Sequence, residues 1–457
     1  MESQNYINSL IERSRAAQQV VENYTQEEVD AIVKAIAKII YDHAEDLARD
    51  AVEETRLGFF DNKLVLNQRI PLTHWDYLKD KKSVGVIDND PIACVKTIAK
   101  PMGIVGCLTP CTNPTPTPLG NAMCAIKGRN SVIVAPHPRA KKVTCRTVEL
   151  MRDEIKKLGA PEDLILIVEE PTLELTNLLI QAVDVVVATG GYGMVKAAYS
   201  SGKPSFGVGQ GNAQVIVDRG YGNHHEMAKG IISNRSTDNG LPCIGEQTLI
   251  LPNDEADQIL SAFTANGAYI VDDPAVVDHI RSVLFQDGVI NKDIVGTPAP
   301  VAAKMLGLND VPDDTRILLV RCSSFGKDEV LCKEVMCPII RVFTYDKFAD
   351  GVAIARANLL FEGAGHSSSV YSHNEAHIEF AANALPVGRV IVNQPNAGAS
   401  GLAYTNGLVP TVSIGCGTWG NNTISENLSY KHLLNVTKVA YRIENAVSPS
   451  ADEVWNA

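Results

Sequence analysis

The sequence predicts an α/β protein built on parallel β-sheets. Short β-branched runs alternate with helix-compatible stretches through most of the chain. Such alternation produces right-handed βαβ units, whose strands lie parallel. The chain has 457 residues, which is more than one hydrophobic core normally supports. We therefore expect two principal α/β domains.

Residues 4–55 are predicted to form two amphipathic helices. Thr25 begins a capping-box pattern that ends at Glu28. Apolar residues then recur at the spacing of one helix face; they are Val29, Ile32, Val33, Ile36, Ile39 and Ile40. We expect this face to pack against the rest of the protein.

The strand-like runs fall into two groups. The first group lies in residues 1–235, a candidate nucleotide-binding domain, at 103–108, 131–135, 164–168, 184–188 and 213–217. The second lies in residues 236–425, a second α/β domain, at 248–251, 316–320, 339–345 and 389–393. Residues 426–457 are predicted to be briefly helical and then loose, and to serve in oligomerisation or return to the first domain. No linker marks the boundary, so it is placed by the motifs around it.

The composition excludes several classes of function. The formal net charge is −12 and basic residues form no long cluster, so nucleic acid is not an expected partner. The longest apolar runs are far shorter than the ~20 residues that cross a bilayer. The N-terminus is acidic and has no apolar signal core. We expect a cytoplasmic protein that binds neither nucleic acid nor membrane.

The ten cysteines are irregularly spaced, which is typical of a reduced compartment. Cys107 and Cys111, and likewise Cys332 and Cys337, are close in sequence but lack the spacing and the nearby histidine pair of a zinc site. We therefore expect no metal. The chemistry of each cysteine has to be argued from its own position.

Two glycine-rich segments could bind a ligand. Thr189, Gly190 and Gly191 form a turn between a strand and a helix, where a phosphate or ribose can approach the backbone. This pattern also fits a plain tight turn. Gly207, Gly209 and Gly211 alternate before a strand. Their backbone would admit a ligand, or they could form a kinked edge strand.

Asn113 and Cys243 are candidates for catalysis. Asn113 lies in a rigid proline-rich segment, where its amide could stabilise an oxyanion or only form a turn. Cys243 follows the turn Asp238-Asn239-Gly240, between the two halves of the chain. A cleft is expected at such a place. From the residues alone, Cys243 could be either a nucleophile or an ordinary buried cysteine.

These segments, in this order, resemble the aldehyde dehydrogenase family. "PMGIVGCLTPCTNPT" is similar to its Pro-x-Gly-Val block and "VATGGYG" to its Phe-Thr-Gly-Ser turn. "CKEVMCPII" resembles its Glu-x-x-x-Gly-Pro block, although Cys337 stands where glycine is usual. The likeness covers residues 5–440. Five further segments resemble the CoA-acylating branch, most of all its succinate-semialdehyde type: "TNPTPTP", "APHPRAKK", "FGVGQGN", "EGAGH" and "GCGTWGNNTISENLSYKHLLN".

The resemblance implies a fold and a nucleophile. The fold is a Rossmann-like nucleotide domain, an α/β catalytic domain and a short oligomerisation element, in a homodimer or homotetramer. Cys243 is the implied nucleophile, with Asn113 and the Cys243 backbone N–H as oxyanion donors. Gly207 stands where hydrolytic relatives have a glutamate base. Because glycine cannot take a proton, the resemblance implies acyl transfer to coenzyme A rather than to water.

The resemblance also implies roles for residues around the cofactor, which is NAD or NADP. Thr189, Gly190, Gly191 and Gly209 would face it, and Glu334 would hold the nicotinamide ribose. His137 and Arg139 would lie near the adenosine ribose or a 2′-phosphate. His366 is either a contact to the thioester and CoA or a hydrogen-bonded core histidine. Arg235 is a candidate partner for an acidic group on the substrate.

The substrate is expected to be a small aldehyde with an acidic end. Succinate semialdehyde, giving succinyl-CoA, is the first choice; sulfoacetaldehyde and acetaldehyde or butanal are alternatives. Pro242 departs from the aliphatic residue usual before the nucleophile. A hydrolytic aldehyde dehydrogenase with a substitute base, and a degenerate structural member of the family, are the competing hypotheses.

Overall fold

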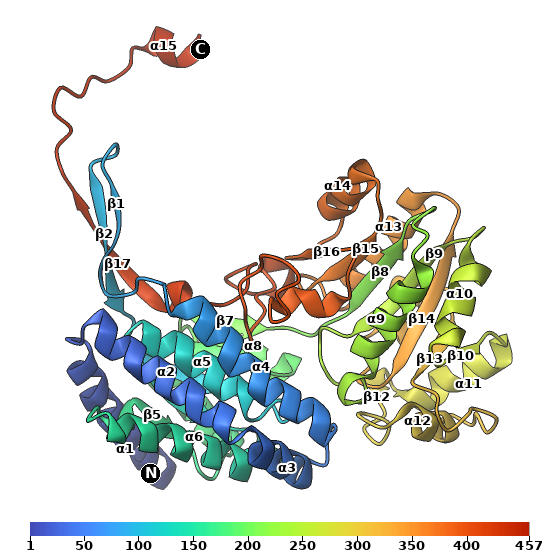
Figure 1. The fold of residues 1–457 in the computed structure, drawn as a ribbon, viewed down its shortest axis with the longest axis horizontal. Helices are drawn as coiled ribbons and strands as arrows, with labels where there is room; N and C mark the ends of the chain where they lie inside the picture. Colours follow the sequence, from blue (N-terminus) through green and yellow to red (C-terminus); the bar gives the residue numbers. More distant parts are fainter. Residues whose placement is uncertain (457) are drawn as a thin grey trace.

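The computed structural model describes residues 1–456, apart from the side chain of Tyr192. Two parallel β-sheets, each covered by helices, form the two lobes of the molecule, and a narrow antiparallel arm projects from the first lobe (Figure 1). The expected α/β class is therefore confirmed. Within the described range, no helix is long and apolar enough to cross a membrane.

The first lobe contains a five-stranded parallel sheet in the order β5-β4-β3-β6-β7. Its strands are β3 (Ile104–Leu108), β4 (Ser131–Ala135), β5 (Ile165–Ile167), β6 (Val185–Thr189) and β7 (Ser205–Val208). Helices cover both faces, so β3 and β4 are buried at every residue. The strand order reverses at the β3–β6 pair, which is where ligands bind in sheets of this kind.

Helices α2 (Gln26–Asp42), α5 (Pro116–Lys127) and α6 (Lys141–Lys157) pack on one face of this sheet. The other face is covered by α1 (Glu2–Val21), α7 (Leu173–Ala182) and α8 (Tyr192–Tyr199). The segment expected to hold two N-terminal helices holds three, because the chain breaks at His43 before α3 (Ala44–Thr55). Helix α4 (Phe60–Leu78) follows and packs on α2, α3 and α5.

The second lobe contains a seven-stranded parallel sheet in the order β10-β13-β14-β9-β8-β15-β16. Its strands are β8 (Ala213–Val217), β9 (Glu246–Pro252), β10 (Ala268–Val271), β13 (Ile317–Arg321), β14 (Ile339–Tyr345), β15 (Ser368–Tyr371) and β16 (Val390–Val392). Helices α9 (His224–Ser236) and α10 (Ala256–Ala265) cover one face. The other face carries α11 (Pro274–Leu284), α12 (Ala299–Met305), α13 (Phe348–Phe361) and α14 (Glu375–Ala384). A small hairpin, β11 (Phe285–Gln286) and β12 (Val289–Ile290), follows α11.

The chain passes from the first sheet to the second before residue 235, where the domain boundary was expected. Strand β8 pairs with β9 and β15, so it belongs to the seven-stranded sheet, and so does the helix α9 that follows it. The chain crosses between the sheets in residues 209–212. A β-branched run shows that a strand forms, but it does not show which strand lies beside it.

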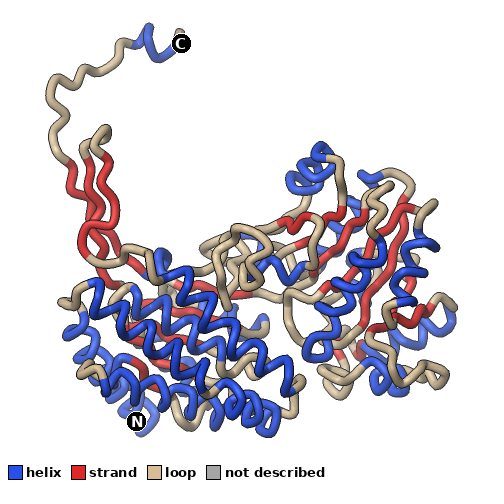
Figure 2. The backbone as a smooth tube through the Cα atoms, in the orientation of Figure 1, coloured by secondary structure: helices blue, strands red, loops and turns tan. Residues whose placement is uncertain are grey.

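The arm is a three-stranded antiparallel sheet of β1 (Gly85–Asp90), β2 (Val95–Pro101) and β17 (Leu434–Ala440). It extends away from the first lobe, and the tail with α15 (Ala451–Trp455) runs beyond it (Figure 2). The sequence predicted a short helix here, but only a 3-10 turn at Tyr430–Leu433 precedes the strand. Because β17 is mostly exposed, it lacks the alternation of apolar residues that reveals a half-buried strand.

Candidate active site

The candidate active site lies between the facing edges of the two sheets. Residues 209–212 leave the carboxyl end of β7 and enter the amino end of β8. Cys243, Glu334 and His366 lie in the loops that lead into β9, β14 and β15, at the same amino edge. The site is therefore built from the carboxyl edge of one parallel sheet and the amino edge of the other.

The thiol of Cys243 faces the imidazole of His366. The His366 Nε2 lies 3.3 Å from the Cys243 Sγ, and its Nδ1 lies 2.8 Å from the Ser367 Oγ. The side-chain amide of Asn396 donates to the same hydroxyl at 3.0 Å. The Ser367 hydroxyl thus fixes one side of the His366 imidazole while the other side faces the thiol. This arrangement favours the functional interpretation over a hydrogen-bonded core histidine.

The pair is uncharged at rest. Burial, assisted by the nearby guanidinium of Arg389, lowers the pKa of His366 to about 3. Burial also raises the pKa of Cys243 to about 12, and the carboxylate of Glu334 and the thiol of Cys416 add to that shift. A neutral imidazole next to a neutral thiol can accept a proton while the sulfur attacks an electrophile.

A hydrogen-bonded scaffold fixes the loop that carries Cys243. The side-chain amides of Asn234 and Asn396 both donate to the Ile244 carbonyl, at 3.0 and 2.9 Å. The buried carboxylate of Glu246 accepts from the Asn396 backbone N–H at 2.8 Å and from the Asn234 amide at 2.9 Å. Burial raises the pKa of Glu246 to about 7. The sequence did not reveal this role of Asn234 and Asn396, since nothing in the pattern links positions so far apart.

The three alternating glycines have distinct surroundings. A side chain on Gly211 would begin 2.0 Å from the Cys243 carbonyl oxygen, so only glycine fits there. A side chain on Gly209 would begin 3.8 Å from the Cys416 sulfur. Gly207 lies in the edge strand β7 and donates its N–H to the Tyr199 hydroxyl at 2.7 Å. A side chain on Gly207 would meet the Tyr199 ring at 2.8 Å, so this position has neither a carboxylate nor room for one.

Residues 1–278 and 324–412 match the model of the aldehyde dehydrogenase family. The chain belongs to the aldehyde dehydrogenase family. It is 48% identical over 449 residues to the succinate-semialdehyde dehydrogenase (acetylating) of Clostridium kluyveri, with 98% of each chain covered. The resemblance to the acylating branch is thereby confirmed.

Solved structures agree with this assignment. An acetylating aldehyde dehydrogenase from Geobacillus thermoglucosidasius superposes with a TM-score of 0.92 at 33% identity, over 98% of this chain and 99% of that one. A propionaldehyde dehydrogenase from Rhodopseudomonas palustris, with bound CoA and an acylated cysteine, superposes with a TM-score of 0.84 at 28% identity, over 95% of this chain and 97% of that one. The expected aldehyde dehydrogenase fold is confirmed.

In this aldehyde dehydrogenase, Glu334 belongs to the nucleophile side of the site. Its carboxylate accepts the Gly211 N–H at 3.0 Å, and its own N–H donates to the Glu362 carboxylate at 2.5 Å. Burial is the first cause that raises the pKa of Glu334 to about 7, and the charge of Glu362 adds to it. Glu334 therefore lies beside Gly211, in the segment that crosses between the two sheets and contacts Cys243.

The opposite edge of the aldehyde dehydrogenase site is open. Gly191 and Gly193 lie at the N-terminus of α8, and apart from their neighbours in the chain and in the helix no described atom lies within 4 Å of where a side chain would begin. Thr189 ends β6 and exchanges a 3.0 Å hydrogen bond with Ser413. An open helix N-terminus after a parallel strand, beside the point where the strand order reverses, fits the phosphates of a dinucleotide.

The remaining predicted cofactor residues lie along the same carboxyl edge. His137 and Arg139 follow β4, with the His137 Nδ1 accepting the Arg139 N–H at 3.1 Å. Burial lowers the pKa of His137, and Arg139 lowers it further. Asn113 follows β3, and its Oδ1 is buried without a hydrogen-bond partner among the described residues. Among the described residues, no hydrogen bond joins Asn113 to Cys243.

Arg235 does not serve the role expected for it. Its guanidinium is fully buried and donates to the carbonyls of Val335, Cys337 and Ile339. It therefore holds the loop before β14 and cannot reach a substrate carboxylate. Sequence proximity to Cys243 suggested the role, but distance along the chain does not tell which way a side chain points.

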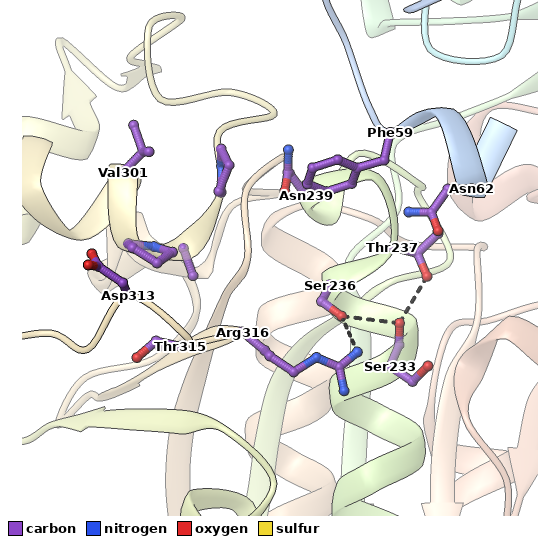
Figure 3. Close-up of a pocket in the computed structure, with 13 residues that line it drawn as sticks. Phe59, Asn62, Ser233, Ser236, Thr237, Asn239, Val301, Asp313, Thr315 and Arg316 are labelled. Atoms are coloured by element: carbon purple, nitrogen blue, oxygen red, sulfur yellow. Dashed lines mark hydrogen bonds between the residues drawn. The ribbon is translucent and has the colours of Figure 1, made fainter. Parts of the chain in front are cut away.

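A cavity of about 570 Å³ lies beside the turn that leads to Cys243. Thr237 and Asn239 of that turn line it, together with Phe59 and Asn62 from the start of α4 (Figure 3). Arg316 enters it from the loop before β13 and donates to the Ser236 hydroxyl at 2.9 Å. The cavity therefore offers hydroxyls, amides, the Arg316 guanidinium and the Asp313 carboxylate.

Proposed function

We propose that this aldehyde dehydrogenase is CoA-acylating, converting an aldehyde, CoA and NAD(P)⁺ reversibly to an acyl-CoA and NAD(P)H. The observation that carries the proposal is the Cys243 thiol held against a neutral His366 imidazole, in a site where Gly207 replaces the glutamate base of hydrolytic relatives and Tyr199 leaves no room for a side chain there. The acylated cysteine of the R. palustris relative supports the same chemistry.

In the first step, the Cys243 sulfur attacks the aldehyde carbon while His366 accepts the thiol proton. Because the pKa values of about 12 and about 3 disfavour a separated ion pair, proton transfer has to accompany the attack. The carbonyl oxygen becomes the oxyanion of a thiohemiacetal. It would accept hydrogen bonds from the Cys243 backbone N–H and the Asn113 amide.

A nicotinamide dinucleotide, when bound, supplies the acceptor for the hydride that leaves the thiohemiacetal carbon. Thr189, Gly190, Gly191 and Gly209 would line its site. Glu334 would hold its nicotinamide ribose, and His137 and Arg139 its adenosine end. Loss of the hydride leaves a thioester on Cys243.

The thioester then passes to CoA. The CoA sulfur attacks the acyl carbon, Cys243 leaves as thiolate, and the CoA thiol proton returns to Cys243. The proton that His366 accepted in the first step is released to water as the H⁺ of the overall reaction. A thiol ionises far more readily than water, so this step needs no carboxylate at position 207. Tyr199 closes that position against a substitute side chain.

For the substrate, we propose an aldehyde with an acidic end, and succinate semialdehyde in particular. The C. kluyveri relative bears that name, and Arg316 puts a cation in the cavity next to the nucleophile turn. Sulfoacetaldehyde is the alternative that shares the charge, since a relative from Acholeplasma carries that name at 39% identity. Acetaldehyde or butanal would not use Arg316.

The proposal is tested by assaying a panel of these aldehydes with NAD or NADP, with and without CoA. We expect NAD(P)H formation that depends on CoA and gives the acyl-CoA. Steady CoA-independent turnover to the free acid would instead identify a hydrolytic enzyme. An Arg316→Met variant should raise KM for succinate semialdehyde about tenfold and leave butanal unchanged, since one charge-assisted contact is lost.

We also propose that the arm of β1, β2 and β17 joins copies of the chain into a homodimer or homotetramer. The exposed residues Val436, Tyr441 and Ile443 at its end support this proposal. Light scattering on the purified protein measures the oligomeric state, and a monomer would contradict it.

A further inference from the structure

We propose that Lys63 is a positioning residue that holds both halves of the oxyanion site in one geometry. Its ammonium joins the turn that leads to Cys243 to the loop that carries Asn113. This inference rests on the proposed function, because it concerns the oxyanion formed during aldehyde oxidation.

Lys63 is buried between the two lobes. It lies on the first turn of α4, and its side chain is 2% exposed. Its ammonium donates to the Asp238 carboxylate at 2.5 Å and also to the backbone carbonyl of Thr112. Asp238 is 1% exposed, so water does not screen this ion pair. Lys63 is therefore a single direct link between two segments on opposite sides of the site.

On the nucleophile side, the ion pair holds a turn of unusual backbone geometry. Asp238 and Asn239 both have left-handed backbones, with φ of 46° and 57°. Such angles are costly for any residue except glycine. Asp238 is fixed by Lys63 and by the Phe59 N–H, which donates to its other oxygen at 3.0 Å. Asn239 donates to the Gly296 carbonyl at 2.8 Å.

Gly58 shows that the site of the Asp238 carboxylate is specific. A side chain on Gly58 would begin 2.5 Å from the Asp238 Oδ1. The carboxylate therefore occupies space that the preceding loop leaves open for it. The turn at Asp238 and Asn239 directs the chain toward Cys243, whose backbone N–H is one proposed oxyanion donor.

On the Asn113 side, α4 holds the loop at both flanks. Lys63 binds the Thr112 carbonyl, and Asn67, one turn later on the helix, accepts the Thr115 hydroxyl at 2.6 Å. Asn113 lies between these two anchors. Its own Oδ1 has no partner among the described residues. The flanks are thus fixed, and no hydrogen bond among the described residues engages the Asn113 Nδ2, which is the atom that would donate to a substrate oxygen.

A second buried pair provides a matched control. Lys127 ends α5, is fully buried and binds Asp30 of α2, within the helical layer of the first lobe. It has the same chemistry as Lys63 but touches neither the Cys243 turn nor the Asn113 loop. Lys63→Met leaves the buried Asp238 without its cation, and Lys127→Met does the same to Asp30, whose side chain is 20% exposed, so both should lower the melting temperature.

Two reactions of the same thiol separate positioning from folding. Aldehyde oxidation forms an oxyanion, whereas alkylation of Cys243 by iodoacetamide is a displacement that forms none. For Lys63→Met we expect kcat to fall by about 10²- to 10³-fold, the loss seen when an oxyanion donor is misplaced. The alkylation rate of Cys243, measured by mass mapping at pH 9, should change less than about threefold. Lys127→Met should keep both rates.

The double variant Lys63→Met/Asp238→Asn keeps the inference testable if Lys63→Met does not fold. It removes both charges and retains a residue that tolerates a left-handed backbone. We expect it to fold and still to show the loss of kcat. A kcat within threefold of wild type, or an equal loss in oxidation and alkylation, would overturn the inference. A wild-type protein that alkylates at Cys243 but oxidises no aldehyde would instead overturn the proposed function.

Discussion

The two edges that meet at the active site are built in opposite ways. At the amino edge of the seven-stranded sheet, Cys243 is surrounded by side chains that bond one another, from His366 through Asn396 to Glu246. At the carboxyl edge of the five-stranded sheet, Gly191 and Gly193 face open space. A reacting sulfur needs a geometry fixed within about half an ångström. A bound dinucleotide supplies the reacting nicotinamide itself, so the edge that binds it needs open space rather than a fixed arrangement of side chains.

The largest effect is expected from removing the sulfur at the crowded edge. Cys243→Ala should lower kcat by on the order of 10⁵- to 10⁶-fold, as for other covalent nucleophiles. Steady-state NAD(P)H formation measures it. Cys94→Ala is the control, since Cys94 is also partly exposed but lies on the arm. Activity retained by Cys243→Ala would show that another group attacks the aldehyde.

Removing the imidazole should have the next largest effect. His366→Ala takes away the group that accepts the thiol proton, so kcat should fall by about 10²- to 10⁴-fold. Because the pKa of His366 is lowered to about 3, His366 should contribute no inflection near 6.5 to the profile of kcat against pH. Any inflection from Glu246 or Glu334, whose pKa values are about 7, should persist in His366→Ala. An inflection there that disappears in His366→Ala would contradict a permanently neutral histidine.

Matched glycine substitutions compare the two edges directly. Gly211→Ala puts a methyl group 2.0 Å from the Cys243 carbonyl oxygen and should displace the thiol, lowering kcat by about 10²-fold. Gly191 has an ordinary φ of −67° and open surroundings. Gly191→Ala should therefore fold normally and raise only the KM for the dinucleotide. Equal losses of kcat in the two variants would contradict the difference between the edges.

The last prediction concerns the thiol in the absence of substrate. With the pKa of Cys243 raised to about 12 by burial, the reactive thiolate is scarce at neutral pH and increases with pH. Alkylation of Cys243 in the ligand-free protein should rise about tenfold per pH unit from pH 7 to pH 10. A plateau below pH 9 would mean that the thiol ionises more readily than its burial predicts.

Most of the fold could be predicted from the sequence because buried parallel strands need apolar side chains on both faces. The runs at 131–135, 213–217 and 339–345 coincide with β4, β8 and β14, and the other expected runs differ from their strands by a few residues at most. Pairing was less predictable. The run at 213–217 forms β8 in the other sheet, and β17 carries too few buried residues to be recognised.

The candidate site was predictable at positions where the type of residue alone indicates the chemistry. Cys243 and Gly207 are informative as a nucleophile and as a missing base. His366 left two interpretations open until its imidazole was found 3.3 Å from the sulfur. The role of Lys63 depends on a contact with a residue 175 positions away, and the Arg235 guanidinium is buried against the Val335 carbonyl. Such contacts come from tertiary packing and leave no mark on the local sequence.

The pairing of β17 with β2 limits when the arm can fold during synthesis of the chain. Asn435 and Pro101 are hydrogen-bonded across 334 positions of sequence, so this contact forms only after Asn435 has been synthesised. Until then, one edge of β2 has unpaired backbone groups, which attract other strands. Pairings of such long range close slowly. The nascent chain should therefore be most prone to aggregate between the folding of the first lobe and the arrival of β17.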